Sequence, residues 1–159
     1  MKIRVGFGFD VHQLKSGRAL WLGGIQLQHD KGALGHSDAD VLIHAICDAL
    51  LGAAGLRDIG FYFPDTSAEF KGIDSKILLH KVNELLLKEG FSIGNIDCTL
   101  VLEKPIINPH IQQMKEVLAG VLNIGVGDIG IKATTNEKMG YVGREEGVCA
   151  YAVALIEKK

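Results

Sequence analysis

Segments with the two-residue period of a β-strand alternate along this chain with segments that have the period of a helix. The strand-like segments are 2–9, 19–28, 96–103, 128–135 and 147–156, and the helical segments are about 38–54, 74–89 and 108–123. The last strand segment is apolar on both faces, as a strand in the centre of a sheet is. This order predicts an α/β fold, an α+β two-layer sandwich whose mixed sheet carries helices on one face. The other face would then be either unusually polar or packed against another subunit.

Turn and capping signals bound these segments. Gly23–Gly24 divides 19–28 into a hairpin. Ser37 and Asp40 have the spacing of a capping box before the first helix, and Asp74 and Gly90 are typical of the start and the end of the second. Two further stretches, 29–38 and 57–73, have the composition of loops.

The composition is that of one globular domain, which we take to span residues 1–159. Hydrophobic residues make up 47% of the chain and charged residues 23%. The chain has 20 glycines but only 3 prolines. Glycine without proline indicates tight turns and places of close backbone approach rather than a linker.

Charge, hydropathy and cysteine usage exclude several classes of protein. A net charge of −2 argues against a general nucleic-acid binder. No apolar run approaches the roughly 18 residues that a membrane span needs. The N-terminus lacks the apolar core of a secretory signal, and the three cysteines are widely spaced without a C-x-x-C pair. We therefore expect a cytoplasmic protein with buried, free thiols.

Two elements carry a candidate metal site. Asp10 and His12 are two residues apart and point the same way from an extended chain, while His44 lies between Asp40 and Asp48 at helical spacing. Asp10, His12 and His44 would supply one carboxylate and two imidazoles, the set of a catalytic zinc site with an open position. Asp40 and Asp48 would orient His44. The alternatives are an incidental surface pair and a solvated helix face.

Two further stretches carry groups suited to phosphate. The start of the first helix, with His36 and Ser37, would offer free N–H groups and side-chain donors. Residues 132–147 gather a lysine, hydroxyls, Glu137, Arg144 and glycines after a strand. A simple capped helix and a polar hairpin loop are the alternatives. The chain contains no G-x-x-x-x-G-K-[ST], G-x-G-x-x-G or G-x-S-x-G motif. The residues alone thus indicate a small α/β protein that handles metal and phosphate.

Five motifs, in order over nearly the whole chain, resemble the 2-C-methyl-D-erythritol 2,4-cyclodiphosphate synthase family of the non-mevalonate isoprenoid pathway. The motifs are Gly8–His12, Ala33–Val41, Asp58–Gly60, Phe63–Thr66 and Lys132–Glu137. The resemblance implies a phosphorus–oxygen lyase that converts 4-diphosphocytidyl-2-C-methyl-D-erythritol 2-phosphate into the 2,4-cyclodiphosphate and CMP. The 2-phosphate of the substrate would attack the β-phosphorus, so the protein would supply positioning and charge neutralisation.

The resemblance also implies roles for individual residues. Asp10, His12 and His44 would bind Zn²⁺, and Glu137 would bind Mg²⁺ or Mn²⁺ together with the substrate phosphates. His36 and Thr135 would stabilise the transition state. The implied substrate-binding residues are Ser37, Asp58, Ile59, Gly60, Phe63, Pro64, Asp65, Thr66, Leu102, Lys104, Pro105, Lys132, Thr134, Tyr141 and Arg144.

By the same resemblance, the protein would be a homotrimer with active sites between neighbouring subunits. It would lie in the bacterial cytosol, or in a plastid-type organelle only if a transit peptide has been removed. Phe9, Tyr141, Arg144 and Glu146 would line the trimer axis, where some family members hold an isoprenoid diphosphate. The family often has phenylalanine in place of Tyr141, and its run of three threonines is Thr134-Thr135-Asn136 here.

Two other functions fit the same residues. A zinc-dependent phosphoester hydrolase would use the same three ligands and would yield a linear product that contains one additional water. A non-catalytic trimer that binds a nucleotide or an isoprenoid diphosphate would keep its ligand after the loss of Asp10 or His44.

Overall fold

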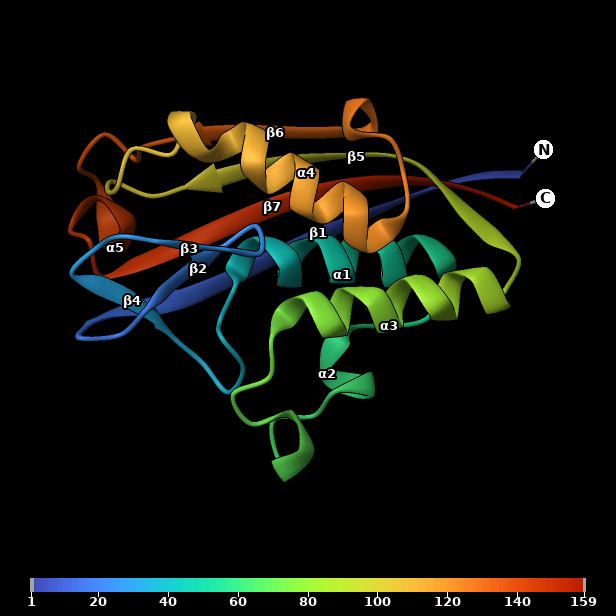
Figure 1. Ribbon diagram of the computed structural model, residues 1–159, viewed down its shortest axis with the longest axis horizontal. Coiled ribbons are helices and arrows are strands. Elements are labelled where there is room, and N and C mark those ends of the chain that lie inside the picture. The colour runs from blue at the N-terminus through green and yellow to red at the C-terminus, as the bar shows by residue number, and fades with distance from the viewer. Residues whose placement is uncertain (1, 159) are drawn as a thin grey trace.

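A computed structural model describes residues 2–158, in which helices cover one face of a five-stranded sheet (Figure 1). The strands are β1 (Lys2–Ser16), β4 (Lys31–Leu34), β5 (Phe91–Val101), β6 (Ile129–Thr134) and β7 (Gly147–Lys158), in the order β4-β1-β7-β5-β6. The main helices are α1 (Val41–Ala54), α3 (Ser75–Lys88) and α4 (Ile111–Leu122). Strands β5 and β6 pair in parallel and the other neighbours in this sheet pair antiparallel, so the sheet is mixed, as expected.

Smaller elements complete the chain. The hairpin of β2 (Leu20–Leu22) and β3 (Ile25–Leu27) forms at the predicted place. The short helices are α2 (Ile59–Tyr62) and α5 (Gly140–Gly143), and 3-10 turns occupy Ala68–Phe70, Asn108–His110 and Val126–Asp128. Within residues 2–158, no helix is long and apolar enough to cross a membrane.

Two glycines of β1 bring α1 directly onto the sheet. A Cβ on Gly6 would lie 1.9 Å from the backbone oxygen of Ala49, and a Cβ on Gly8 would lie 1.9 Å from that of Ala45. Any side chain at either position would force the helix away from the strand. These are the close approaches that the glycine content predicted, and at these two residues α1 lies directly on β1.

The expectation of a loop over 29–38 was wrong in part, because β4 lies within it and pairs with β1 from Gln13 to Ser16. Pairing with β4 and β7 extends β1 well beyond residue 9. The segment 57–73 likewise contains α2 and a 3-10 turn. Strand β5 begins at Phe91, five residues before the expected start.

The capping box expected at the first helix does not form. Asp40 is the N-cap, and its side chain accepts a hydrogen bond from the backbone N–H of Ile43 at 3.1 Å. Ser37 lies outside the helix and accepts from the N–H of Ala39 at 3.0 Å. Helix α1 therefore begins at Val41 rather than near residue 38. The predicted N-cap of α3, Asp74, is confirmed.

The two faces of the sheet differ sharply. Strand β7 lies in the centre, as predicted, and its inward side chains pack against α1. The three cysteines are buried and free. The face opposite the helices exposes large apolar side chains, which we call the uncovered face: Ile3, Val5, Phe7, Phe9, Val11, Tyr151 and Val153. This face is apolar, so of the two alternatives for it, packing against another subunit is favoured over unusual polarity.

Candidate active site

Asp10, His12 and His44 meet where α1 crosses β1. Asp10 and His12 lie on the side of β1 that faces α1, and His44 lies on α1 itself. Asp10 Oδ2 is 3.0 Å from His12 Nε2 and 3.1 Å from His44 Nδ1, and these two nitrogens are 3.1 Å apart. The structure thus brings together the three residues that the sequence could only propose as a set.

The chemistry of these three atoms fits a cation. His12 Nδ1 lies 3.1 Å from the carbonyl oxygen of Leu34, which can only accept, so His12 Nδ1 carries the hydrogen. A neutral His12 therefore directs the lone pair of Nε2 at the other two atoms. The separations of 3.0 to 3.1 Å are close to the roughly 3.3 Å edge of a tetrahedron around Zn²⁺ with bonds of about 2.0–2.1 Å.

The pKa values of Asp10 and His44 are shifted in the directions that this arrangement favours. Burial alone would raise the pKa of Asp10, but hydrogen bonds and charge from His12 and His44 lower it to about 2. Burial likewise opposes protonation of His44, but the Asp10 carboxylate raises its pKa overall, with help from Asp40 and Asp38. The carboxylate thus favours a positive charge beside it, whether a proton or a metal ion carries that charge.

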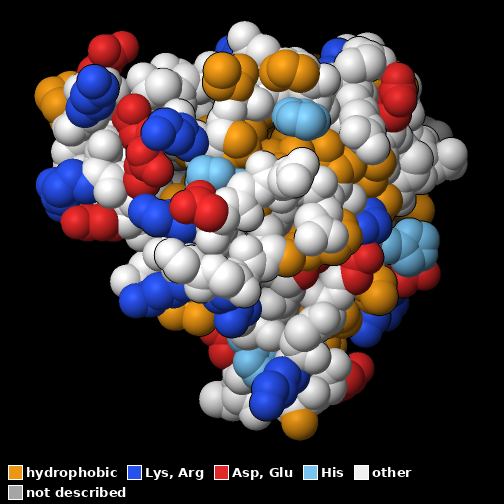
Figure 2. All heavy atoms as spheres, turned by 60° about the vertical axis from the view of Figure 1, so that its left-hand side comes forward, with side chains coloured by type: hydrophobic (Ala, Val, Ile, Leu, Met, Phe, Trp, Pro, Cys, Tyr) orange, Lys and Arg blue, Asp and Glu red, His pale blue; other side chains and the backbone are white. Residues whose placement is uncertain are grey.

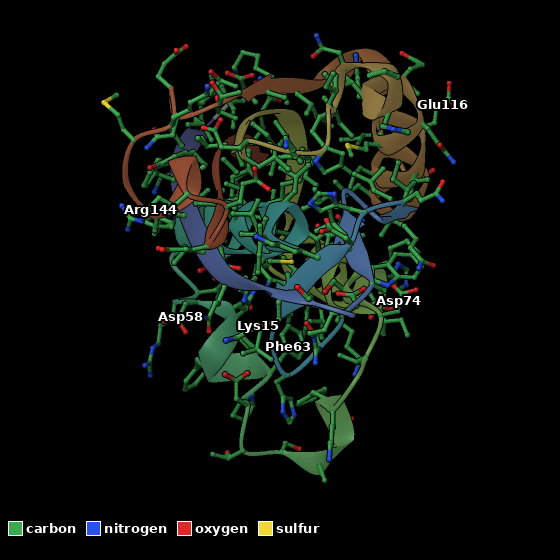
Figure 3. All side chains as sticks on the ribbon, turned by 90° about the vertical axis from the view of Figure 1, so that its left-hand side faces the viewer. Lys15, Asp58, Phe63, Asp74, Glu116 and Arg144 are labelled. Atoms are coloured by element: carbon green, nitrogen blue, oxygen red, sulfur yellow. The ribbon has the colours of Figure 1, made fainter. Side chains whose placement is uncertain are left out.

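A cavity of about 330 Å³ opens in front of the cluster. Nine residues proposed from the sequence line it: Asp10, His12, His36, Ser37, His44, Ile59, Gly60, Phe63 and Asp65. His36 Nε2 lies 3.0 Å from the backbone oxygen of Ser67, and the backbone oxygen of His36 accepts from the N–H of Gly72 at 2.7 Å. These contacts hold the 57–73 segment against one side of the cavity. Figure 3 shows Asp58 and Phe63 at α2, above the part of this segment that projects from the body of the protein.

Aromatic side chains join the projecting segment to α3. The rings of Phe63 and Phe70 meet edge to face, with centroids 5.4 Å apart. Lys81 of α3 places Nζ 6.0 Å from the Phe63 centroid and 5.4 Å from the Phe70 centroid, and 3.9 Å from Glu69 Oε1. Since Phe63 also lines the cavity, Lys81 contacts one wall of the candidate site from behind.

A second cavity, of about 210 Å³, lies beyond the ends of β5 and β6. Four residues to which the resemblance assigned roles line it: Leu102, Pro105, Thr134 and Thr135. Glu103 also lines it; the resemblance implied a role for the backbone of the segment 102–108, but the use of the Glu103 carboxylate was not foreseen. Its Oε1 accepts from the backbone N–H groups of Asn136 at 2.9 Å and Lys138 at 3.3 Å.

Glu137 sits in a backbone turn that Glu103 holds. Glu137 and Lys138 both have positive φ, 51° and 61°. Two successive non-glycine residues in this region are energetically costly and need support from their surroundings. The Glu103 carboxylate supplies part of that support, because it binds the N–H groups of the residues before and after Glu137. The Glu137 side chain itself is exposed.

The two cavities lie at the same end of the sheet but apart. Asp10 of β1 is in register with Ala150 of β7, and Ala150 with Leu100 of β5. With β6 beyond β5, three strand spacings separate β1 from β6, roughly 14 Å. Within one chain, the metal cluster is therefore not brought together with Thr135 and Glu137. Figure 2 looks toward this end of the molecule, where acidic and basic side chains are interspersed.

The remaining proposed residues line neither cavity. Asp58 caps α2 and accepts from the N–H of Phe61 at 3.0 Å. Lys132 forms an ion pair with Asp97, and Lys104 Nζ is 3.6 Å from Glu145 Oε1. Arg144 pairs with Glu146 through both Nε and Nη2 at 3.0 Å. The other proposed residues that line neither cavity are Pro64, Thr66 and Tyr141.

The two proposed partners of His44 are wrong. Asp40 is buried, and its carboxylate accepts from the N–H groups of Gly23 at 3.0 Å and Gly24 at 2.7 Å, besides capping α1. Asp48 accepts from the N–H of Ile59 at 2.8 Å. Both carboxylates accept hydrogen bonds from backbone N–H groups of other segments, which helical spacing cannot predict. The hydroxyls that do lie at His44 Nε2 belong to Ser75, at 3.0 Å, and Ser37, at 3.1 Å.

Comparisons with known proteins identify the family of this chain. The profile of the YgbB family matches residues 3–157. The 2-C-methyl-D-erythritol 2,4-cyclodiphosphate synthase of Bacteroides thetaiotaomicron is 64% identical over 158 residues, 99% of each chain.

Solved structures give the same result. The bifunctional IspDF from Campylobacter jejuni superposes with a TM-score of 0.96 at 39% identity, over 99% of this chain and 43% of that one. The CDP complex of IspF from Plasmodium falciparum gives a TM-score of 0.87 at 33% identity, over 99% and 97% of the two chains. The resemblance seen in the five motifs is confirmed, and the chain belongs to the YgbB family.

Proposed function

We propose that Asp10, His12 and His44 hold the metal ion with which this chain carries out the reaction of its family. That reaction converts 4-diphosphocytidyl-2-C-methyl-D-erythritol 2-phosphate into 2-C-methyl-D-erythritol 2,4-cyclodiphosphate and CMP, and the enzyme is a phosphorus–oxygen lyase. The observation that carries the metal assignment is the convergence of one carboxylate oxygen and two imidazole nitrogens within 3.1 Å of each other at the cavity. Zinc is the ion that this donor set suits best.

The reaction needs little covalent chemistry from the protein. The attacking 2-phosphate is already anionic, so no general base is required, and the difficulty is the approach of two anions. A bound zinc ion would supply Lewis-acid stabilisation of that charge. His36 and Ser37 would bind and orient the phosphates from the cavity wall. Ile59, Gly60, Phe63 and Asp65 would hold the erythritol and exclude water, with Pro64 and Thr66 continuing the same wall, and Asp58 would contact the erythritol from the start of α2.

The second cavity would bind the cytidine end of the substrate. Leu102, Lys104 and Pro105 would recognise the base, and Thr134, Thr135 and Lys132 would contact the diphosphate. Glu137 would share a Mg²⁺ or Mn²⁺ ion with the diphosphate, for which its exposed carboxylate is suited. The CDP complex of the Plasmodium falciparum relative supports a cytidine diphosphate site on this fold.

A complete site requires a second copy of the chain. One chain holds the metal cluster and the second cavity roughly 14 Å apart. The uncovered face, with Phe7 exposed to 62% and Val5 to 64%, is the surface on which another copy would pack. We infer a cytoplasmic homotrimer in which the metal cluster of one subunit faces the second cavity of its neighbour. Tyr141 and Arg144 would lie toward the axis, where a diphosphate group of an isoprenoid would meet Arg144.

Replacement of His44 tests the metal assignment. His44→Ala should lose bound zinc and lower turnover by about 10³-fold, since Lewis-acid stabilisation is worth several kcal/mol. His80→Ala is the matched control, because His80 is exposed on α3 and its Nε2 lies 3.6 Å from Glu84 Oε1. Metal content, circular dichroism and product mass are the readouts. Full turnover of His44→Ala without zinc would contradict the assignment, and a product heavier by one water would indicate the hydrolase instead.

A further inference from the structure

We propose that Ser75 is a positioning residue that fixes the His44 imidazole with Nδ1 toward the metal. The proposal rests on the metal site proposed above and assigns a role to a residue outside the set inferred from the sequence. Ser75 is the first residue of α3, and it is fully buried. Its hydroxyl reaches across to α1 and lies 3.0 Å from His44 Nε2.

Asp38 determines the direction of the hydrogen bonds in this cluster. Its Oδ1 forms a short hydrogen bond with Ser75 Oγ, and its Oδ2 accepts from the backbone N–H of Ser75 at 3.0 Å. The backbone N–H of Asp40 also donates to Oδ1, at 3.2 Å. An ionised carboxylate can only accept, so the hydroxyl hydrogen of Ser75 points at Asp38.

The tautomer of His44 follows from this direction. With its hydrogen committed to Asp38, Ser75 Oγ can only accept from His44 Nε2. Nε2 must then carry a hydrogen, and in the neutral ring that leaves the lone pair on Nδ1. Nδ1 is the atom that lies 3.1 Å from Asp10 Oδ2 and 3.1 Å from His12 Nε2. The Asp38–Ser75–His44 series thus prepares Nδ1 as a metal ligand, as a carboxylate partner does for other ligating histidines.

Ser37 supports the same tautomer less firmly. Its Oγ lies 3.1 Å from His44 Nε2 and accepts from the N–H of Ala39 at 3.0 Å. Ser37 also lines the cavity, on the side from which substrate would enter. Ser75 does not line the cavity, and both its backbone N–H and its hydroxyl donate to the Asp38 carboxylate. Of the two serines, Ser75 is therefore the partner that stays in place when substrate binds.

Nitrogen NMR of the zinc-loaded wild-type protein tests the tautomer without any substitution. With ¹⁵N-labelled histidine, we expect Nε2 of His44 to carry a slowly exchanging hydrogen and Nδ1 to show the shift of a metal-bound nitrogen. Coordination through Nε2 would overturn the inference. Failure of the wild-type protein to bind zinc through these residues would instead overturn the metal site itself.

Replacement of Ser75 tests its part in the arrangement. Ser75→Ala keeps the N-cap of α3, because the Asp74 side chain accepts from the N–H of Lys76 at 2.9 Å. We expect about a 10-fold loss of zinc affinity in competition with a chelator, the lower end of the range for such partners, since Ser37 remains. The His44 Nε2 hydrogen should also exchange faster with water.

Ser92→Ala is the matched control, because Ser92 is a half-buried serine on β5 whose Oγ donates to the backbone oxygen of Glu157 at 3.5 Å. It should leave both readouts unchanged. Unaltered zinc affinity in Ser75→Ala would overturn the role of Ser75. So would a loss of affinity with an unchanged His44 Nε2 signal, because that result would mark a purely structural effect.

Discussion

Gly8 of β1 lies so close to Ala45 of α1 that a methyl group on Gly8 would be 1.9 Å from the Ala45 carbonyl oxygen. His44 is the neighbour of Ala45, and Asp10 is the next residue of β1 that faces the helix. The distance between strand and helix at this point therefore sets the distance between the metal ligands that each of them carries. The cluster can form because Gly8 has no side chain to hold the helix away from the strand.

Substitution of Gly8 should therefore damage stability and metal binding together. Gly8→Ala places a methyl group against backbone atoms that cannot move independently, and we expect it to cost about 3 kcal/mol, near the upper end for overpacked cores. Thermal unfolding should show a Tm about 10 °C lower, and zinc titration a weaker site.

Gly52→Ala on α1 is the control for this substitution. Its Cβ would lie 3.9 Å from the Phe7 carbonyl oxygen, an ordinary contact, and alanine favours the helix by about 0.5–1 kcal/mol. A Gly8→Ala protein as stable as wild type would show that α1 can shift away from β1.

The stability of the zinc-free protein should depend on pH through Asp10 and His44. Asp10 has a pKa lowered to about 2 from 3.8, so its contribution is present above pH 3.8 and is lost as pH falls toward 2. His44 has a raised pKa, so its contribution is complete below pH 6.5 and is lost as pH rises through the folded value.

Zinc should reverse the trend on the alkaline side, because it takes the place of the His44 proton. The increase in Tm on adding zinc should therefore grow from pH 6.5 to pH 8. Thermal unfolding with chelator or with zinc across this range checks both trends. A zinc-induced increase in Tm that is flat over this range would contradict the assignment of His44 as a ligand.

Removal of the Lys81 ammonium should loosen the wall of the cavity without unfolding the protein. Lys81 lies over the Phe63 and Phe70 rings at 6.0 and 5.4 Å, and exposed contacts of this kind are worth about 0.5–1 kcal/mol. Lys81→Ala should raise KM about two- to fivefold with little change in kcat, and speed hydrogen exchange over residues 63–72. Lys81→Arg keeps the cation and should resemble wild type. Equal exchange rates in Lys81→Ala and wild type would show that Lys81 does not restrain the segment.

A charge on the uncovered face should dissociate the assembly. Phe7→Asp would bury an unpaired carboxylate in the proposed interface between copies, and the desolvation of that charge would strongly disfavour association. Light scattering after size exclusion should change from the mass of a trimer to that of a monomer. Turnover should fall as well, because each site would lose its second cavity. Ile77→Asp, at an apolar residue 47% exposed on α3, should remain trimeric. A Phe7→Asp trimer would place the interface elsewhere.

Periodicity could place the three candidate ligands on their elements because each placement is local. Alternation along β1 places Asp10 and His12 on one side, and the helical period places His44 on the helix that follows His36 and Ser37. The same period suggested Asp40 and Asp48 as partners of His44. It failed there because the partner of a buried carboxylate is decided by tertiary packing, which brings the hairpin N–H groups to Asp40 and Ile59 to Asp48.

Ser75 was beyond the reach of the sequence for a related reason. Nothing near residue 75 suggests a histidine partner, and 31 residues separate Ser75 from His44. The contact exists because α3 starts beside α1, an arrangement that depends on the whole core. Strand β4 was missed likewise, since four residues with two glycine or alanine positions have a weak strand signal until they pair with β1.

The most direct test of the account is ³¹P NMR of the purified protein with the cytidyl diphosphate substrate, Mg²⁺ and trace Zn²⁺, with and without a chelator. We predict release of CMP together with two coupled diphosphate signals of a cyclic product. The reaction should stop with the chelator and resume when zinc is restored. CMP with a linear bisphosphate, or cyclisation that continues at full rate without metal, would contradict the assignment of Asp10, His12 and His44.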